Sequence, residues 1–165
     1  MERKDKINYY LDIADAVLNR STCLRRQYGA IIVSNDEIIA TGYNGAPRGR
    51  KNCIDISNCT RELMNIPSGE RYELCRSVHA EANAIISAAR SEIIGGTLYL
   101  VGREVKTGRL LNTTIPCSMC KRLIINAGIT EVICRTSETE YDRISVLDWV
   151  YDDDSLKNSI AADYT

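Results

Sequence analysis

The feature that most constrains the fold is a set of metal-binding side chains at the starts of two predicted helices. Cys117 and Cys120 follow Pro116 in the segment PCSMC, and their three-residue spacing puts both thiols on one helix face. At a helix N-terminus, free N–H groups and the macrodipole favour the thiolate, which is the form that binds metals. His79, the one histidine of the chain, lies at the start of another predicted helix in SVHAEANAI. If these three groups bind one zinc ion, the fold must bring the two helix starts together.

This donor set predicts a catalytic zinc site. Two thiolates and one imidazole leave one position of tetrahedral zinc open for water, whereas four protein ligands usually close a structural site. Glu81 stands two residues after His79, so both side chains can serve one site only where the helix begins. A carboxylate beside that water can act as general base and then as general acid. Alone, a C-x-x-C pair is often structural or redox-active, and a lone histidine more often belongs to the core or the surface. Their combination favours catalysis.

Hydrophobic periodicity predicts an alternating α/β order. Residues 5–20 have helical spacing, and Asn35-Asp36 separates two β-rich segments, 30–34 and 37–43, which indicates a hairpin. The pattern further predicts a helix over 78–90, a strand over 96–101, a helix over 116–128 and a strand over 130–134. Loops are expected over 44–77 and 102–115, the first long enough to be functional or stapled. After Ser137 a strand, a helix or one followed by the other all remain open. The order predicts a sheet covered by helices.

Length and charge limit the classes of protein to which this chain can belong. The 165 residues fit a single domain, 1–165, and the net charge of −1 argues against binding to long nucleic acid. Residues 137–165 hold eight acidic and two basic side chains, and the assignment of this segment to the domain is the weakest. No apolar run is long enough for a membrane span, and MERKDKINYY lacks the apolar region of a secretory signal. We therefore expect a cytoplasmic protein without a membrane partner.

On these motifs the chain resembles the cytidine/deoxycytidylate deaminase superfamily, and within it the deoxycytidylate (dCMP) branch. H-x-E followed by P-C-x-x-C is the known pattern of zinc nucleobase deaminases. The resemblance covers roughly residues 5–150 and also rests on GAIIV, CRSVHAE and TGYNGAPRG, residues 41–49. It implies a three-layer α/β/α fold with a five-stranded mixed sheet and zinc at two helix starts.

The resemblance implies hydrolytic deamination of dCMP to dUMP and ammonia, a reaction that supplies dUMP for thymidylate synthesis. The enzyme would be a hydrolase acting on the C–N bond of a cyclic amidine, with water attacking C4 of cytosine and Glu81 moving the proton to N3 and then to ammonia. Asn44 would hold the sugar, although a turn asparagine before Gly45 is the alternative. The backbone near Ala80 would help to bind the base.

Candidates for binding the phosphate are Arg25, Arg26 and Arg48, since each guanidinium could make bidentate contacts. For each of them alone, a solvated surface arginine is the alternative. Tyr141 resembles a family tyrosine near the base, and a core tyrosine is equally consistent with the sequence.

The chain has seven cysteines, and their odd number excludes a complete intramolecular disulfide framework. Four of them form a possible second, structural zinc site, as in some dCMP deaminases: Cys23, Cys53, Cys59 and Cys75. Four thiolates around zinc would fix a long loop that has little core of its own. The alternative is free thiols packed as small apolar groups, which is the interpretation we give Cys134.

The resemblance also implies a homo-oligomer, a hexamer or a dimer, and in some members dCTP activates and dTTP inhibits. The C-terminal stretch WVYDDDSLKNS departs from better-known members, so the oligomer is expected here but this regulation is not transferred. Three other hypotheses stay open: a tRNA adenosine deaminase, a deaminase of a free nucleoside or modified pyrimidine, and a non-catalytic zinc module. Glu81 argues against the last, because a structural site needs no proton shuttle.

Overall fold

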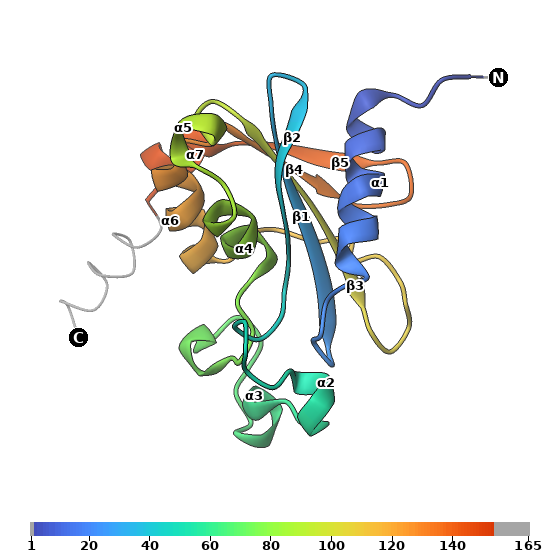
Figure 1. Cartoon of the computed structure of the whole chain (residues 1–165), viewed down its shortest axis with the longest axis vertical. Coiled ribbons are helices and arrows are strands. Elements are labelled where there is room, and N and C mark those ends of the chain that lie inside the picture. The colour runs from blue at the N-terminus through green and yellow to red at the C-terminus, as the bar shows by residue number, and fades with distance from the viewer. Residues whose placement is uncertain (1, 154–165) are drawn as a thin grey trace.

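The computed structural model describes residues 2–153, in which one five-stranded sheet carries helices on both faces (Figure 1). The strands are β1 (Arg26–Ser34), β2 (Glu37–Tyr43), β3 (Thr97–Glu104), β4 (Glu131–Arg135) and β5 (Tyr141–Ser145). Their order in the sheet is β2-β1-β3-β4-β5; β3 and β4 are parallel and the other neighbouring pairs are antiparallel. The expected five-stranded mixed sheet in a three-layer α/β/α arrangement is confirmed.

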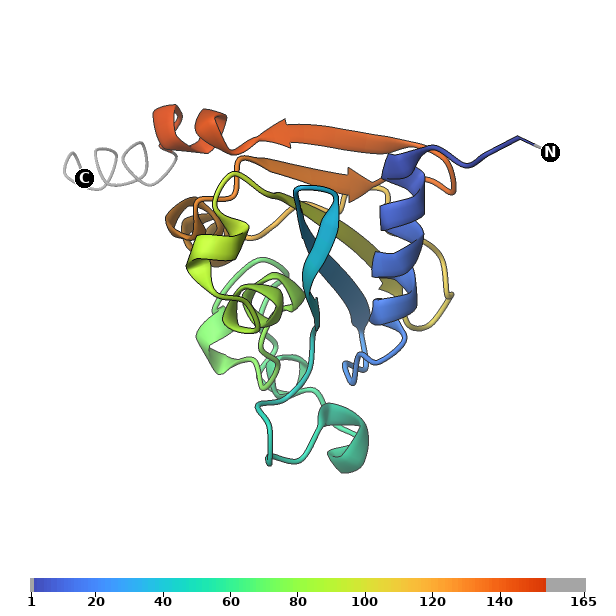
Figure 2. The same ribbon diagram turned by 45° about the horizontal axis from the view of Figure 1, so that its top comes forward.

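Helix α1 (Lys6–Leu18) covers one face of the sheet (Figure 2). Asp5 caps this helix, because its carboxylate accepts a hydrogen bond from the backbone N–H of Asn8 at 3.0 Å. The helix buries one stripe of side chains against strand residues that all point to the same face. This cluster consists of Tyr10, Leu11, Ala14, Leu18, Ile31, Val33, Tyr99, Val101 and Ile133. The alternate residues of the strands point to the opposite face, as the period of two requires.

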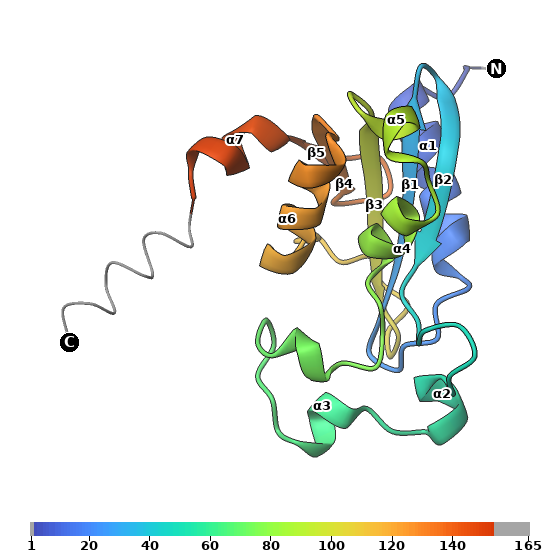
Figure 3. The ribbon, with the colours of Figure 1, turned by 60° about the vertical axis from the view of Figure 1, so that its left-hand side comes forward.

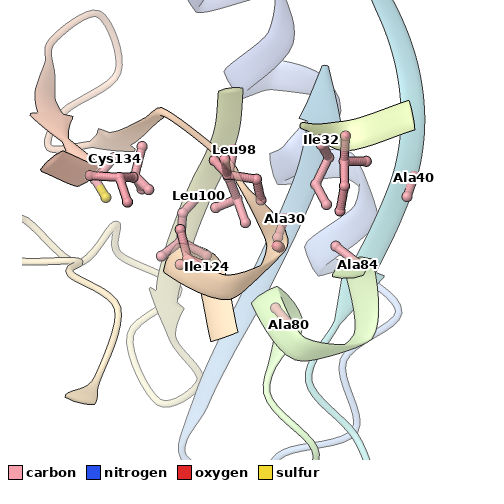
Figure 4. Close-up of a cluster of buried hydrophobic side chains, with 14 residues drawn as sticks. Ala30, Ile32, Ala40, Ala80, Ala84, Leu98, Leu100, Ile124 and Cys134 are labelled. Atoms are coloured by element: carbon pink, nitrogen blue, oxygen red, sulfur yellow. The ribbon is translucent and has the colours of Figure 1, made fainter. Parts of the chain in front are cut away.

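The opposite face carries α4 (Ala80–Ile86), α5 (Arg90–Ile93), α6 (Ser118–Ala127) and α7 (Val146–Tyr151) (Figure 3). Figure 4 shows the apolar cluster beneath them, where Leu98 and Leu100 of the sheet lie near Ile124 of α6, and Ile32 belongs to the same cluster. Gly42 of β2 lets α4 approach very closely: a Cβ there would lie 2.2 Å from the carbonyl oxygen of Ala80. This packing fixes the start of α4 against the sheet.

The segment over residues 44–77 forms a third region, beyond one end of the sheet in every view (Figure 1, Figure 2 and Figure 3). It contains three short helices, α2 (Cys53–Ile56), α3 (Thr60–Leu63) and the 3₁₀ helix η1 (Tyr72–Leu74). Ile54, Leu63 and Met64 are more than half exposed, so this segment has little apolar core of its own.

Most of the expected elements are confirmed, and two expectations are wrong. The hairpin turn forms at Asn35 and Asp36, both with positive φ, and β5 is followed by α7, one of the three arrangements left open after residue 137. The helix expected over 78–90 ends at Ile86 and a separate short helix follows, while the loop over 44–77 contains helices that show no sequence periodicity. Within residues 2–153, no helix is long and apolar enough to cross a membrane. The last part of the acidic segment, 154–165, lies outside the described residues.

Candidate active site

Three metal-binding side chains meet where α4 and α6 begin. His79 is the N-cap residue of α4, Cys117 is the N-cap residue of α6, and Cys120 lies in the first turn of α6. The Nδ1 atom of His79 lies 3.5 Å from Sγ of Cys117 and 3.4 Å from Sγ of Cys120. In the part of the chain that the structure describes, this is the one group of at least three such residues whose ligand atoms all lie within 4.8 Å of one another. The expected convergence of two helix starts is confirmed.

The geometry of this group fits zinc. With zinc–sulfur bonds of about 2.3 Å and zinc–nitrogen bonds of about 2.0–2.1 Å, tetrahedral geometry separates nitrogen and sulfur ligands by about 3.6 Å. The two separations of 3.4 and 3.5 Å are close to this value. A hydrogen bond from Cys120, with a second from His79, lowers the pKa of the Cys117 thiol, while the same bond to Cys117 raises the pKa of the Cys120 thiol. A thiolate therefore forms at Cys117 readily, as metal binding requires.

Glu81, in the first turn of α4, is 5% exposed and lines the same pocket as His79 and Cys117. Burial raises the pKa of its carboxyl group above the ordinary value, because the charged form loses hydration. Such a carboxyl group binds and releases a proton closer to neutral pH than an exposed glutamate does.

The pocket has two walls. The catalytic wall, as we call it, comprises His79, Glu81 and Cys117 at the helix starts, and the loop wall comprises side chains of the 44–77 segment: Cys59, Arg61, Ser68, Tyr72 and Cys75. The remaining lining residues are Cys23, Arg25, Arg26, Tyr28, Asn44, Ser77 and Ile115. The Tyr72 ring packs edge-on against the His79 ring, with centroids 4.9 Å apart and an interplanar angle of 87°. The loop wall therefore contacts a metal-binding residue directly.

Asn44 is a fixed, buried lining residue with an exposed fraction of 6%. Its Oδ1 accepts hydrogen bonds from the Ser21 hydroxyl at 2.6 Å and from the backbone N–H of Tyr28 at 2.8 Å. Its Nδ2 donates to the carbonyl oxygen of Arg26 at 2.9 Å. A side-chain amide has two N–H donors, so one remains for a ligand in the pocket. Gly45 and Val78 exchange backbone hydrogen bonds, which ties this segment to the start of α4.

The structure brings some of the other expected site residues to the pocket but not all of them. Arg25 and Arg26 line it, whereas Arg48 is exposed and does not. Ala80 directly follows His79, and its side chain is in the core. Tyr141 packs with the α1 cluster on the opposite face of the sheet and does not line the pocket, which agrees with the alternative of a core tyrosine. The one-residue alternation of β5 explains this placement.

Of the five cysteines outside this group, three lie close enough to Cys53 for their charges to act on its thiol. Burial, and then the charges of Cys23, Cys75 and Cys59, raise the pKa of the Cys53 thiol. Within residues 2–153, however, no three of these thiols come as close together as the ligand atoms of His79, Cys117 and Cys120 do. Cys134 is fully buried in the apolar cluster under α6, as expected of a packed thiol.

Sequence reasoning missed Arg61 and Tyr72. The guanidinium carbon of Arg61 lies 4.7 Å from the Tyr72 ring centroid, and both residues line the pocket. Neither belongs to a recognisable motif or a periodic segment. The one available signal was the length of the irregular loop itself.

Comparison with known proteins assigns the chain to a family. Residues 4–136 match the profile of the family described as "Cytidine and deoxycytidylate deaminase zinc-binding region". The deoxycytidylate deaminase of Mycobacterium phage D29 is 40% identical over 138 residues, covering 81% of this chain and 96% of that protein. The deoxycytidylate deaminase of Schizosaccharomyces pombe is 33% identical over 79% of this chain, but the match spans only 37% of that longer protein.

Solved structures agree with this assignment. The dCMP deaminase of the cyanophage S-TIM5, in complex with dCMP and dUMP, superposes with a TM-score of 0.55 at 29% identity, covering 81% of this chain and 84% of that chain. A cytidine deaminase from Burkholderia pseudomallei has a TM-score of 0.54 at 19% identity, covering 85% of this chain and 92% of that chain. The second likeness concerns the fold alone.

Proposed function

The chain belongs to the cytidine and deoxycytidylate deaminase family, and we propose that it converts dCMP and water into dUMP and ammonia. One observation carries this proposal: a buried glutamate lines the same pocket as a convergent histidine and cysteine group at two helix starts. The named activities of the phage relative and of the cyanophage structure support dCMP as the substrate.

The residues of the pocket account for the parts of this reaction. His79, Cys117 and Cys120 would hold zinc, which supplies a Lewis acid that lowers the pKa of water. Glu81 would take a proton from the attacking water, deliver it to N3 of cytosine, and then transfer a proton to the departing amine. C4 thereby gains oxygen and loses ammonia. The unused amide hydrogen of Asn44 would hold the sugar, and the backbone near Ala80 would help to bind the base.

A substrate panel tests the proposal: dCMP, CMP, deoxycytidine and an adenosine-containing tRNA stem-loop, with ammonia release as the readout. We expect the highest kcat/KM for dCMP. Deamination of adenosine in the stem-loop without activity on dCMP would favour a tRNA adenosine deaminase. Bound zinc without turnover of any of the four would favour a non-catalytic zinc module.

The second zinc site is a separate proposal. Cys23, Cys53, Cys59 and Cys75 would bind a structural zinc ion and fix the 44–77 segment; the charges of Cys23, Cys75 and Cys59 at the Cys53 thiol support this proposal. Zinc per chain, measured on pure protein, tests it: we expect about two ions, and a value near one contradicts the second site.

Assembly and location remain further proposals. We propose a single deaminase domain over residues 1–165 that acts in the cytoplasm as a homo-oligomer, a dimer or a hexamer. Exposed apolar side chains on the contacting helices α4, α6 and α7 support the oligomer: Ile86, Leu123, Leu147, Val150 and Tyr151. Light scattering measures the oligomeric state. Ammonia release from dCMP, measured with added dCTP or dTTP, tests these nucleotides as regulators.

A further inference from the structure

Arg61 of α3 is a buried cation that forms no ion pair within residues 2–153, although, after Arg71, its charge also lowers the pKa of the exposed Glu73 carboxyl group. It is 6% exposed, and none of the ion pairs in this part of the chain includes it. Its Nη2 donates to the carbonyl oxygens of Pro67 and Glu70, both at 2.7 Å, while its Nε is buried without a hydrogen-bond partner. Burying a charge costs free energy unless the charge is paired and its donors are satisfied. The unsatisfied donor and the unpaired charge therefore indicate a site for an anionic ligand.

The position of Arg61 connects this cation to the catalytic wall. Its guanidinium lies over the ring of Tyr72, which in turn packs edge-on against His79. Arg61 and Glu81 line the same pocket. A molecule that occupies the pocket could therefore place an anionic group at Arg61. That group would be separated from His79 by the ring of Tyr72.

Other arginines are less suited to binding an anionic group in the pocket. Arg25 lines the pocket, but its Nε pairs with Glu62 at 3.1 Å, which partly neutralises its charge. Arg26 is exposed, so water screens its charge. Arg135 is even more buried than Arg61, at 2% exposed, but its Nη2 pairs with Asp12 at 2.8 Å on the far side of the sheet. Among these buried or pocket-lining arginines, Arg61 alone combines burial, the absence of an ion pair and a place in the pocket.

We infer that Arg61 binds the phosphate of the nucleotide substrate and is the residue that makes the enzyme prefer a nucleotide over a nucleoside. This inference rests on the proposed function and deepens it. Guanidinium binds phosphate through charge-assisted hydrogen bonds, often two at once. Nη2 and the Tyr72 ring hold the guanidinium plane in place at the lining of the pocket, where its charge can attract the phosphate.

Kinetics of Arg61→Gln on dCMP and deoxycytidine test the inference. Glutamine keeps an amide donor for the carbonyl oxygens of Pro67 and Glu70 but removes the charge. We expect kcat/KM for dCMP to fall roughly 30- to 100-fold, mainly through KM, because a hydrogen bond to a charged group is lost. We expect kcat/KM for deoxycytidine to change less than about 3-fold, since no phosphate is present. A purely structural contribution of Arg61 would lower both values equally, and that result would overturn the inference.

Arg71→Ala is the matched control. Arg71 lies in the same segment, but it is exposed and pairs with Glu73 at 3.0 Å, so both substrates should react as with the wild-type protein. Loss of the preference for dCMP in this control would also overturn the inference.

Calorimetric binding of the products separates this inference from the proposed function. If the wild-type protein fails to deaminate dCMP, the function is wrong, but tighter binding of dUMP than of deoxyuridine, lost in Arg61→Gln, still supports the phosphate site. If dCMP is deaminated and Arg61→Gln keeps the wild-type ratio of kcat/KM for dCMP to kcat/KM for deoxycytidine, Arg61 does not bind the phosphate. Should Arg61→Gln fail to fold, Arg61→Lys takes its place, because lysine keeps the charge and loses the planar fork. Its kcat/KM for dCMP must then fall, by less than is expected for Arg61→Gln, while kcat/KM for deoxycytidine stays unchanged.

Discussion

The two walls of the pocket are built in different ways. The catalytic wall stands on helix starts that are fixed to the sheet, because Ala80 and Ala84 of α4 are fully buried and Gly42 lets the helix approach β2. The loop wall stands on helices of three or four residues, in which Ile54 and Leu63 are more than half exposed. In the proposed function, rigid elements position the groups that move protons, and a loop supplies groups that select the substrate. Damage to the first wall should therefore reduce turnover and stability, and damage to the second should change selectivity.

The largest expected effect is on the catalytic wall. Cys117→Ser replaces a thiolate ligand by a hydroxyl group, so we expect zinc at this site and deaminase activity to be lost together, with kcat/KM down by more than about 10³-fold. Metal analysis and ammonia release measure both. Cys134→Ala is the control, since Cys134 lies in the core under α6, and it should keep its zinc and its activity. Full activity of Cys117→Ser would contradict the assignment of this ligand.

Two glycine variants compare how much the packing behind each wall contributes to the free energy of unfolding. Gly42→Ala places a Cβ 2.2 Å from the backbone of Ala80, so we expect it to lower the free energy of unfolding by about 2–4 kcal/mol. Gly69→Ala has open space around the new Cβ, but φ is +90°, so about 1 kcal/mol of backbone strain is expected. Urea unfolding measures both values. Equal losses would mean that the loop wall is packed as firmly as the catalytic wall.

The smallest expected effect is on the 44–77 segment behind the loop wall. Cys53→Ala removes one of the four thiols proposed to bind the second zinc ion, so we expect one zinc ion fewer per chain and a KM for dCMP raised about 3- to 10-fold, with kcat nearly unchanged. Zinc content and steady-state kinetics measure these changes. An unaltered zinc content would mean that these cysteines are free thiols.

The same contrast explains what the sequence could reveal. The catalytic wall could be predicted because its residues are close together in the sequence. His79 and Glu81 lie within one helical turn, and so do Cys117 and Cys120. The two β-rich segments around Asn35-Asp36 likewise predicted the hairpin of β1 and β2. Arg61 could not be found in this way, because its burial depends on carbonyl oxygens and an aromatic ring that an irregular loop brings to it. The end of α4 was also missed, since the alanine-rich stretch up to residue 90 has high helix propensity but the chain turns at Ser87.

The most direct test of the account is ammonia release from dCMP by Glu81→Gln, compared with the wild-type protein at equal zinc content. Glutamine keeps the size of the side chain but cannot shuttle a proton, so we expect kcat to fall by about 10³-fold while zinc stays bound. A zinc-loaded Glu81→Gln protein that deaminates dCMP at the wild-type rate would contradict the assignment of Glu81 as the proton carrier beside the metal.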